Sequence, residues 1–314
     1  MERVNSEQTP VAGRPRMAQT VRLGLRRLYR ELMPLLYART NFKLFLERSF
    51  QSLDRRTAAI LCSTNVLPGM MRAVPVRAPF GRSMLVVAPH QDDEIIGCGG
   101  AMLLQKAAGR EVHVVFTQDG GDEHAEDGRT REEQIAIREA ESRAVAAAMG
   151  IPEPRFLRGV HLTGPEADRL AAELAEEIER VRADTVFTPF FLDYNYHHQL
   201  TNYILADALA RTARKPQIYG YEVWGLTVPN VVLNIDDVAA DKRRLLSLYT
   251  SQISGKDYVH AIEGRNMYHS IHFGAGECRF AERFFEIPAD EFVQTMGAIR
   301  AHMSEPDAGR PAEF

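Results

Sequence analysis

Short apolar runs alternate with longer helical patterns from about residue 83 onward. The runs over 84–88, 112–116, 185–188, 217–222 and 231–235 have the length and composition of buried strands, and 155–157 is a shorter candidate. Apolar residues at three-to-four spacing predict helices over 95–108, 132–149, 165–181, 199–210 and 238–248, and Gly150 is a natural stop for the second of these. This alternation is typical of a largely parallel sheet flanked by helices. We therefore predict a Rossmann-like α/β domain over residues 81–314.

The first 80 residues have a different pattern. Residues 1–20 are polar and aperiodic and predict a flexible tail, whereas 21–61 contain leucine and phenylalanine at helical spacing among arginines. Two or three amphipathic helices fit this segment, and three prolines over 68–81 favour a linker. The resulting prediction is a tail, a basic helical extension with its linker over 21–80, and then the α/β domain.

Charge separates the two parts further. Residues 1–80 carry 14 Lys and Arg against 5 Asp and Glu, a net +9, whereas the remainder carries 24 against 37, a net −13. The basic helices could dock on the acidic domain, bind a partner or make a peripheral contact with an anionic membrane surface, and docking is the simplest of these. Nucleic-acid binding is disfavoured by the acidic domain and by the absence of a known module.

The chain has no segment that predicts membrane insertion or export. No apolar run reaches the roughly 18 to 20 residues that a spanning helix needs, and the first 20 residues contain no hydrophobic signal region. Its three cysteines, Cys62, Cys98 and Cys278, are widely spaced, which argues against a disulfide framework or a cysteine-based zinc site. We expect a cytoplasmic protein, peripheral at the membrane if the basic helices bind lipid.

The most informative stretch follows the first strand of the α/β domain. It runs His90-Gln91-Asp92-Asp93-Glu94, at the carboxyl end of a buried strand, where ligands collect in open α/β sheets. His90 and Asp93 are three residues apart, so one helical turn would place both side chains on the same face, where they can share a metal. The alternative is that these carboxylates cap the helix that begins near Ile95.

A second polar segment follows a later strand and supplies the remaining chemistry. It runs from Asp193 through Asn195 to His197 and His198, and either histidine could be a third ligand. Two histidines and one carboxylate with an open position for water are the usual composition of a catalytic zinc site, whereas structural zinc sites are closed by four protein ligands. The pair of segments therefore favours a catalytic metal over helix capping.

These segments resemble a known family. His90-Gln91-Asp92-Asp93-Glu94 is similar to the Ala-His-Pro-Asp-Asp-Glu motif of the PIG-L/LmbE-like deacetylases, with Gln91 in place of proline. The family's second motif, His-Pro-Asp-His, aligns on 195–198 and keeps only its last histidine. Weaker similarities are Arg138-x-x-Glu141 with Met149-Gly150, Tyr249-Thr250-Ser251-Gln252 and Ala281-Glu282-Arg283-Phe284. The resemblance covers about 83–290 and excludes the basic extension.

The resemblance implies specific roles. His90, Asp93 and His198 would bind one zinc ion, and Asp92 would be the general base that takes a proton from the attacking water. Asn195 stands where the family has a histidine that helps to stabilise the oxyanion or protonate the amine, and asparagine cannot donate a proton at neutral pH. Protonated Asp92 could return its proton instead, or His197 or a late-loop histidine (His260, His269 or His272) could supply it.

Three further residues are candidates for substrate binding. Asp119, in a polar loop with Asp122, could bind sugar hydroxyls or simply belong to a glycine-permitted turn. Arg138 could anchor substrate or pair with Glu141 on the helix surface. Asp193 could bind substrate or orient His198.

These residues predict an enzyme rather than a binding module. The expected reaction is zinc-dependent hydrolysis of the N-acetyl group of an amino sugar, such as N-acetylglucosamine, or of a sugar conjugate. A phosphoesterase is the first alternative, because His and Asp clusters also bind two metals. The second alternative is a degenerate family member without activity, whose core serves as a scaffold for the basic helices. The replacement of the family's histidine by Asn195 permits this reading.

Overall fold

The computed structural model describes residues 73–121, 128–225, 227, 229–254 and 257–302, all within the unit Ala59–Phe314. In these residues eight strands form one sheet, in the order β1-β7-β8-β6-β5-β2-β3-β4. The strands are β1 Val74–Val76, β2 Ser83–Ala88, β3 Glu111–Gln118, β4 Arg155–Gly159, β5 Thr185–Pro189, β6 Gln217–Tyr221, β7 Val231–Asn234 and β8 Ala281–Pro288. All pairs are parallel except those of β8, which runs antiparallel to β6 and β7. The predicted α/β class with a largely parallel sheet is confirmed.

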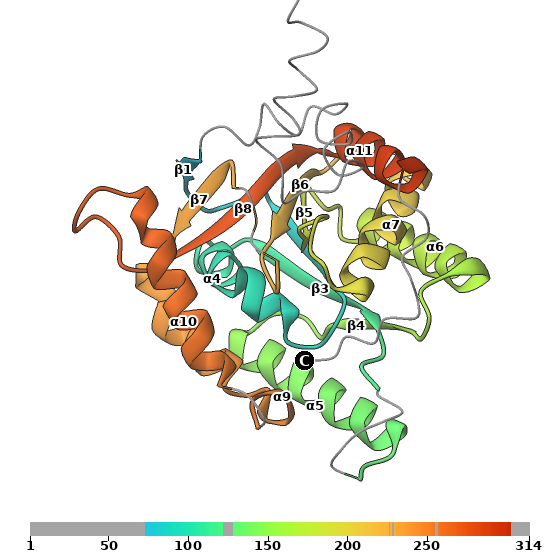
Figure 1. Cartoon of the computed structure of the whole chain (residues 1–314), viewed down its shortest axis with the longest axis horizontal. Coiled ribbons are helices and arrows are strands. Elements are labelled where there is room, and N and C mark those ends of the chain that lie inside the picture. Colours follow the sequence, from blue (N-terminus) through green and yellow to red (C-terminus); the bar gives the residue numbers. More distant parts are fainter. Residues whose placement is uncertain (1–72, 122–127, 226, 228, 255–256, 303–314) are drawn as a thin grey trace, which may run out of the picture. The chain divides into compact units, whose positions relative to one another are not determined.

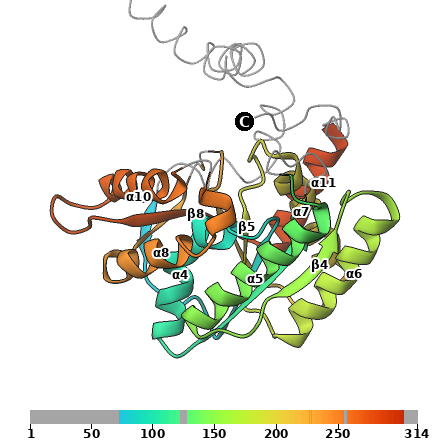
Figure 2. The ribbon, with the colours of Figure 1, turned by 90° about the horizontal axis from the view of Figure 1, so that it is seen from below.

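Helices cover both faces of this sheet (Figure 1, Figure 2). One layer contains α4 Asp93–Ala107, α5 Arg131–Met149, α8 Ala239–Leu246, the short α9 Thr250–Ile253 and α10 Tyr258–His269. The other contains α6 Gly164–Arg180, α7 Tyr196–Arg211 and α11 Ala289–His302. No helix in the described part of the chain is long and apolar enough to cross a membrane.

Local sequence explains where the best-defined helix begins and ends. The hydroxyl of Thr130 accepts a hydrogen bond from the Glu133 amide, and the Glu133 carboxylate accepts one from the Thr130 amide, so the first turn of α5 is capped reciprocally. Gly150 follows the last turn in the left-handed region, with φ 73°. The predicted stop at Gly150 is confirmed.

The structure corrects part of the sequence prediction. In the segment read as a linker, Val74–Val76 forms β1 and pairs with β7. The hydrophobic pattern does not indicate α10 or α11. It does not indicate β8 either, because this strand mixes charged residues with apolar ones and buries Glu282. Helix α7 begins at Tyr196, three residues before the predicted start. The tail and the basic helices over 21–61 lie outside the described residues, so the proposed domain boundaries stay a prediction.

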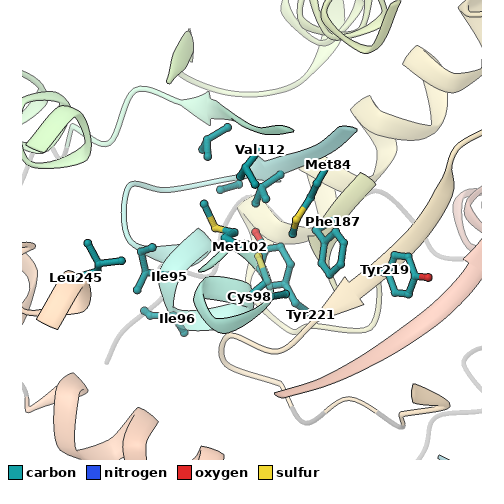
Figure 3. Packing of buried hydrophobic residues seen from close by; sticks show 14 of the residues in the cluster. Met84, Ile95, Ile96, Cys98, Met102, Val112, Phe187, Tyr219, Tyr221 and Leu245 are labelled. Carbon is teal, nitrogen blue, oxygen red and sulfur yellow. The ribbon is translucent and has the colours of Figure 1, made fainter. Parts of the chain in front are cut away.

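The core beneath α4 determines how the functional loop is held. Met102 of this helix lies beside Met84 and Val112 of the sheet, and Ile95 points toward Leu245 of α8, as Figure 3 shows. Gly97 lies against Tyr221 so closely that an added Cβ would be 2.1 Å from the ring carbon Cδ2. Only glycine lets the first turns of α4 approach the sheet to this distance.

Candidate metal centre

The loop after β2 brings the first motif to the carboxyl edge of the sheet. The chain leaves β2 at Ala88 and enters α4 at Asp93, and Asp92 between them has φ 138°, a conformation that non-glycine residues rarely adopt. Its carbonyl oxygen accepts the amides of Ile95 and Ile96, and its own amide donates to Glu94 Oε2 at 3.1 Å. The Asp92 carboxylate caps nothing. The capping explanation of this motif therefore does not hold for Asp92.

Three side chains converge at this edge. Asp93 Oδ2 lies 3.0 Å from His90 Nδ1 and 3.4 Å from His198 Nε2. One ligand atom from each residue can be chosen so that all three lie within 4.8 Å of one another, and no other such group of His, Cys, Asp or Glu occurs in the part of the chain that the structure describes. His90 keeps 17% of its side chain exposed whereas His198 is fully buried, so the cluster opens to solvent on the His90 side.

The buried histidine fits a metal ligand. Neither ring nitrogen of His198 has a hydrogen bond of regular geometry, although Asp193 Oδ1 lies 3.3 Å from Nδ1. A buried polar atom without a partner is costly, and a bound cation would satisfy Nε2. A carboxylate behind the other ring nitrogen is the usual way in which proteins orient a metal-binding imidazole. His90, Asp93 and His198 thus have the composition and placement to hold a divalent metal.

The charges of the cluster are strongly coupled. Burial alone would raise the pKa of Asp93, but His198 and His90 hold it well below its usual range. Burial likewise works against protonation of His198, yet Asp93 and Asp193 raise its pKa to about 9. The pKa of His90 is lowered, first by burial. This concentration of negative charge around His198 is what a divalent cation would neutralise.

Asp92 is available for proton transfer. Its carboxylate is buried and accepts no hydrogen bond from another described residue. Burial raises its pKa well above the ordinary value, with a further rise from Asp93, while Arg138 opposes the shift. The side chains of Arg138 and Gln91 both pack against Gly120, where an added Cβ would lie 2.8 Å from Arg138 Cδ and 2.2 Å from Gln91 Oε1.

The second motif enters the site through the start of α7. His197 Nδ1 lies 3.1 Å from His90 Nε2, and its Nε2 lies 2.9 Å from Gln118 Nε2, so both ring nitrogens are engaged. The pKa of His197 falls to about 3, mainly because the ring is buried and then because His90 lies beside it. Asn195 caps α7, since its Oδ1 accepts the amides of His197 at 2.9 Å and His198 at 3.4 Å.

Two of the predicted substrate residues, Asp193 and Asp119, have structural partners within the protein. Asp193 contacts His198 and accepts hydrogen bonds from the amides of Trp224 and Gly225 at 3.0 and 2.9 Å. These contacts favour the role of orienting His198 over that of binding substrate. Asp119 binds the Gly121 amide and both terminal nitrogens of Arg131, as expected for a residue that holds a turn.

Glu141 and His269 each have a partner that the sequence did not suggest. Glu141, the proposed surface partner of Arg138, instead binds Ser251 and Thr250. Of the late histidines, His269 is paired with Glu222 at 3.0 Å.

A break in α4 is closed by buried charges that sequence analysis missed. Cys98 has non-helical backbone angles (φ −141°, ψ 21°), which leaves backbone groups on both sides without helical partners. Glu282 accepts the amides of Gly100 and Ala101 at 2.7 and 2.8 Å. Lys242 and Arg265 donate to the carbonyl of Ile96 at 3.1 and 3.0 Å, and Lys242 also binds Glu282 at 2.7 Å. These contacts fix the short helical segment that carries Asp93.

Three residues of the quoted motifs, Gln91, Glu94 and Tyr249, support the site although the sequence analysis gave them no catalytic or binding role. Tyr249 donates to Glu94 Oε1, and burial raises the pKa of Glu94 to about 7. Gln91 Nε2 donates to the carbonyls of Gln118 and Asp119 at 3.3 and 3.2 Å, which ties the two loops together. Tyr249 and Glu282 lie in segments of family resemblance, which was a usable signal, whereas nothing in the sequence marks Lys242.

Comparison with known structures supports the fold. N,N'-diacetylchitobiose deacetylase from Pyrococcus horikoshii is 20% identical, with a TM-score of 0.58 over 66% of this chain and 84% of that one. GalB, the 4-carboxy-2-hydroxymuconate hydratase from Pseudomonas putida, is 22% identical, with a TM-score of 0.56 over 66% and 96%. The zinc-inhibited form of teicoplanin deacetylase Orf2 is 13% identical, with a TM-score of 0.53 over 66% and 99%. The hydratase among them shows that this fold alone does not determine the reaction.

The sequence itself matches one family model. No curated protein matches the chain. Residues 85–209 match the family described as PIG-L: GlcNAc-PI de-N-acetylase, and this segment includes most of β2 and α7 and all three candidate metal ligands. The segment over residues 85–209, which includes all three candidate metal ligands, is therefore similar to the PIG-L family, and the fold agrees with that similarity.

Proposed function

We propose that this protein is a zinc-dependent deacetylase that hydrolyses the N-acetyl group of an amino sugar or sugar conjugate. The observation that carries the proposal is the cluster of His90, Asp93 and His198 beside the unbonded carboxylate of Asp92, within the segment that matches the PIG-L family. A zinc ion held there would acidify water to a pKa near 7 and polarise an amide carbonyl.

Asp92 has the position and the environment of the general base. Its carboxylate is next to Asp93 in sequence and free of hydrogen bonds from the described residues, so it can accept a proton from the attacking water. Burial favours the protonated carboxyl, which can then deliver that proton to the leaving nitrogen. Arg138 opposes complete neutralisation and keeps the group able to ionise.

The leaving-group proton has two possible donors. The ring nitrogens of His197 are already engaged by His90 and Gln118, and Asn195 uses its oxygen to cap α7. These contacts favour the route through Asp92. Asn195 then remains as a hydrogen-bond donor for the reacting carbonyl or nitrogen, because its cap of α7 uses only Oδ1 and leaves the side-chain NH2 group for substrate.

The sugar part of the proposal rests on the family and on the neighbouring deacetylases. Chitobiose deacetylase shares the fold, and the family is described by the removal of acetyl from a glucosamine lipid. We assign Arg138 to substrate anchoring because it lies beside Asp92 and Gly120 without the Glu141 partner proposed for it. Asp119 is a weaker substrate contact, because its oxygens are already occupied.

The experiment is acetate release from N-acetylglucosamine in free, nucleotide-linked, lipid-linked and small glycoside forms. Metal-stripped protein is compared with protein reloaded with one equivalent of zinc, excess zinc or cobalt, since a zinc-inhibited form exists for a deacetylase of this fold. Metal-dependent acetate release from any compound supports the proposal. Phosphate release from the lipid-linked or nucleotide-linked compounds would indicate a phosphoesterase, and bound metal with no turnover would indicate a scaffold.

A further inference from the structure

A wide depression lies at the edge of the sheet opposite the metal cluster. Its volume is about 990 Å³, and it forms where the loops that enter β2, β3 and β5 meet. The Glu111 amide donates to the Arg82 carbonyl and the Asp184 amide donates to the Ser83 carbonyl, each at 3.0 Å, which holds these loops together. We call this the basic depression because of the cations that line it, Arg82, Lys106, Arg110, Arg180, Arg182 and Arg214.

Most of this positive charge is not neutralised by the protein. Arg180 pairs with Glu177 and Arg214 with Glu179. No carboxylate within ion-pair distance is found among the described residues for the four others, Arg82, Lys106, Arg110 and Arg182. The two carboxylates in the lining, Asp184 and Glu111, do not form ion pairs with these four cations. Asp184 Oδ2 accepts the amides of Arg82 and Ser83, and Glu111 lies 3.5 Å from His113.

The location makes the cluster unusual for this protein. The domain that contains it carries an excess of carboxylates, a net −13 over residues 81–314, yet four exposed cations gather around one hollow. Like charges placed together repel one another, and a bound anion would relieve that repulsion. Arginine is suited to this purpose, because its planar guanidinium binds two phosphate oxygens at once.

The size and lining of the basic depression define the class of ligand. About 990 Å³ is at the upper end of the range for small-molecule sites, but such sites are usually apolar and this one is lined mainly by charged groups. An apolar or singly charged ligand would leave most of the cations uncompensated. A ligand with two or more phosphate groups matches both the volume and the number of free cations.

The basic depression is independent of the metal site. It lies at the amino ends of β2 and β5, whereas His90 and His198 follow their carboxyl ends. Strand β2 has six residues, so the two sites are about 20 Å apart along it. They share no residue, and binding in one requires no metal in the other.

We propose that the basic depression binds a multiply phosphorylated ligand through Arg82, Lys106, Arg110 and Arg182. Such phosphates could belong to a soluble compound or to the headgroup of a membrane lipid. The chemistry of recognition is the same in both cases, and the source is decided by experiment.

The test uses the full-length protein with two probes. Pyrophosphate binding is measured by isothermal titration calorimetry, and sedimentation is measured with vesicles of phosphatidylcholine alone or with a phosphatidylinositol bisphosphate. The test variant is Arg110→Gln/Arg182→Gln. The matched control is Arg244→Gln/Arg300→Gln, which removes the same charge from two exposed sites outside the depression. Thermal melting verifies that both variants are folded, and Arg82→Gln/Lys106→Gln replaces the test variant if it is not.

Loss of two cations is expected to weaken binding by about tenfold or more, because charge-assisted contacts are the stronger hydrogen bonds, while the control changes it little. Weakened pyrophosphate binding would identify a soluble ligand as sufficient. Weakened binding of the phosphatidylinositol bisphosphate vesicles alone would identify a lipid headgroup. Failure of the unchanged protein to bind either probe, or equal effects of test and control variants, would overturn the proposal. Acetate release is not part of this test, so its result is separate from that of the proposed function.

Discussion

The carboxylate of Asp193 lies 3.3 Å from Nδ1 of His198, while Asp93 Oδ2 lies 3.4 Å from Nε2 of the same ring. The fully buried imidazole is therefore held between two carboxylates, one behind it and one within the metal cluster. Asp193 is itself fixed by the amides of Asn195, Trp224 and Gly225. This arrangement orients His198 before any metal binds.

Asp193→Asn should weaken metal binding by about 10- to 100-fold, because the orienting charge is removed while the acceptor oxygen is kept. The measurement is zinc affinity by competition with a chromophoric chelator. Asp168→Asn, on the exposed surface beside Arg211, is the control and should leave zinc affinity unchanged. Equal zinc affinity in Asp193→Asn and the unchanged protein would contradict the orienting role.

Asp92→Asn should lower kcat for acetate release by about 10² to 10⁴-fold while zinc content is retained, because the base is lost but no ligand is. Asp93→Asn provides the comparison and should lose both activity and metal. Turnover by Asp92→Asn at the unchanged rate would show that another group takes the proton.

Glu282→Gln should destabilise the fold by about 3 to 5 kcal/mol, because Lys242 would remain buried without its partner. The measurement is urea unfolding. Glu286→Gln, on the same strand but half-buried against Tyr219, should have a much smaller effect. Adding Lys242→Met to Glu282→Gln should restore part of the loss, and simple additivity of the two changes would argue against their coupling.

The buried carboxylate of Glu222 should make the free energy of unfolding depend on pH under acidic conditions. It contacts Arg283 at 2.5 Å and His269 at 3.0 Å. Burial works against ionisation, but His269 and Arg283 lower the pKa of Glu222 from 4.5 to about 2.

Because the folded-state pKa of Glu222 is depressed, its contribution is present above pH 4.5 and is lost as the pH falls toward 2, by about 2 kcal/mol near pH 3. Urea unfolding of the unchanged protein and Glu222→Gln across this range is the measurement. The difference in unfolding free energy between them should narrow as acid is added. A constant difference would refute the prediction.

Trp224, the one tryptophan in the chain, should report substrate binding. Its amide is bound by Asp193, and its ring contacts Tyr258, whose pKa is raised by burial and then by Asp92. Titration with an N-acetylated substrate should change its fluorescence, whereas glucosamine without the acetyl group should do so at higher concentration. No change at concentrations that support full turnover would place the substrate away from Trp224.

The sequence by itself determined the parts that depend on local pattern. The runs that form β2, β3 and β5 are continuous apolar segments, and the helices between them have clear periodicity and stops such as Gly150. Because parallel strands end at one edge of a sheet, His90, Asp93 and His198 could be expected to meet before any coordinates were known. The resemblance of 195–198 to the family's second motif then chose His198 over His197, and the structure places His198 with His90 and Asp93.

Only the tertiary structure decided which distant side chains complete the site. Glu282 belongs to an antiparallel strand that mixes charged and apolar residues, and Lys242 lies on a polar helix. Both side chains are nevertheless buried at the break in α4. The capping role of Asn195 and the packing of Arg138 against Gly120 likewise depend on loop geometry. The basic depression joins residues from 82 to 214 whose spacing forms no pattern. Local sequence specifies strands and turns through short-range preferences, whereas contacts across a hundred residues exist only once the sheet has brought its edges together.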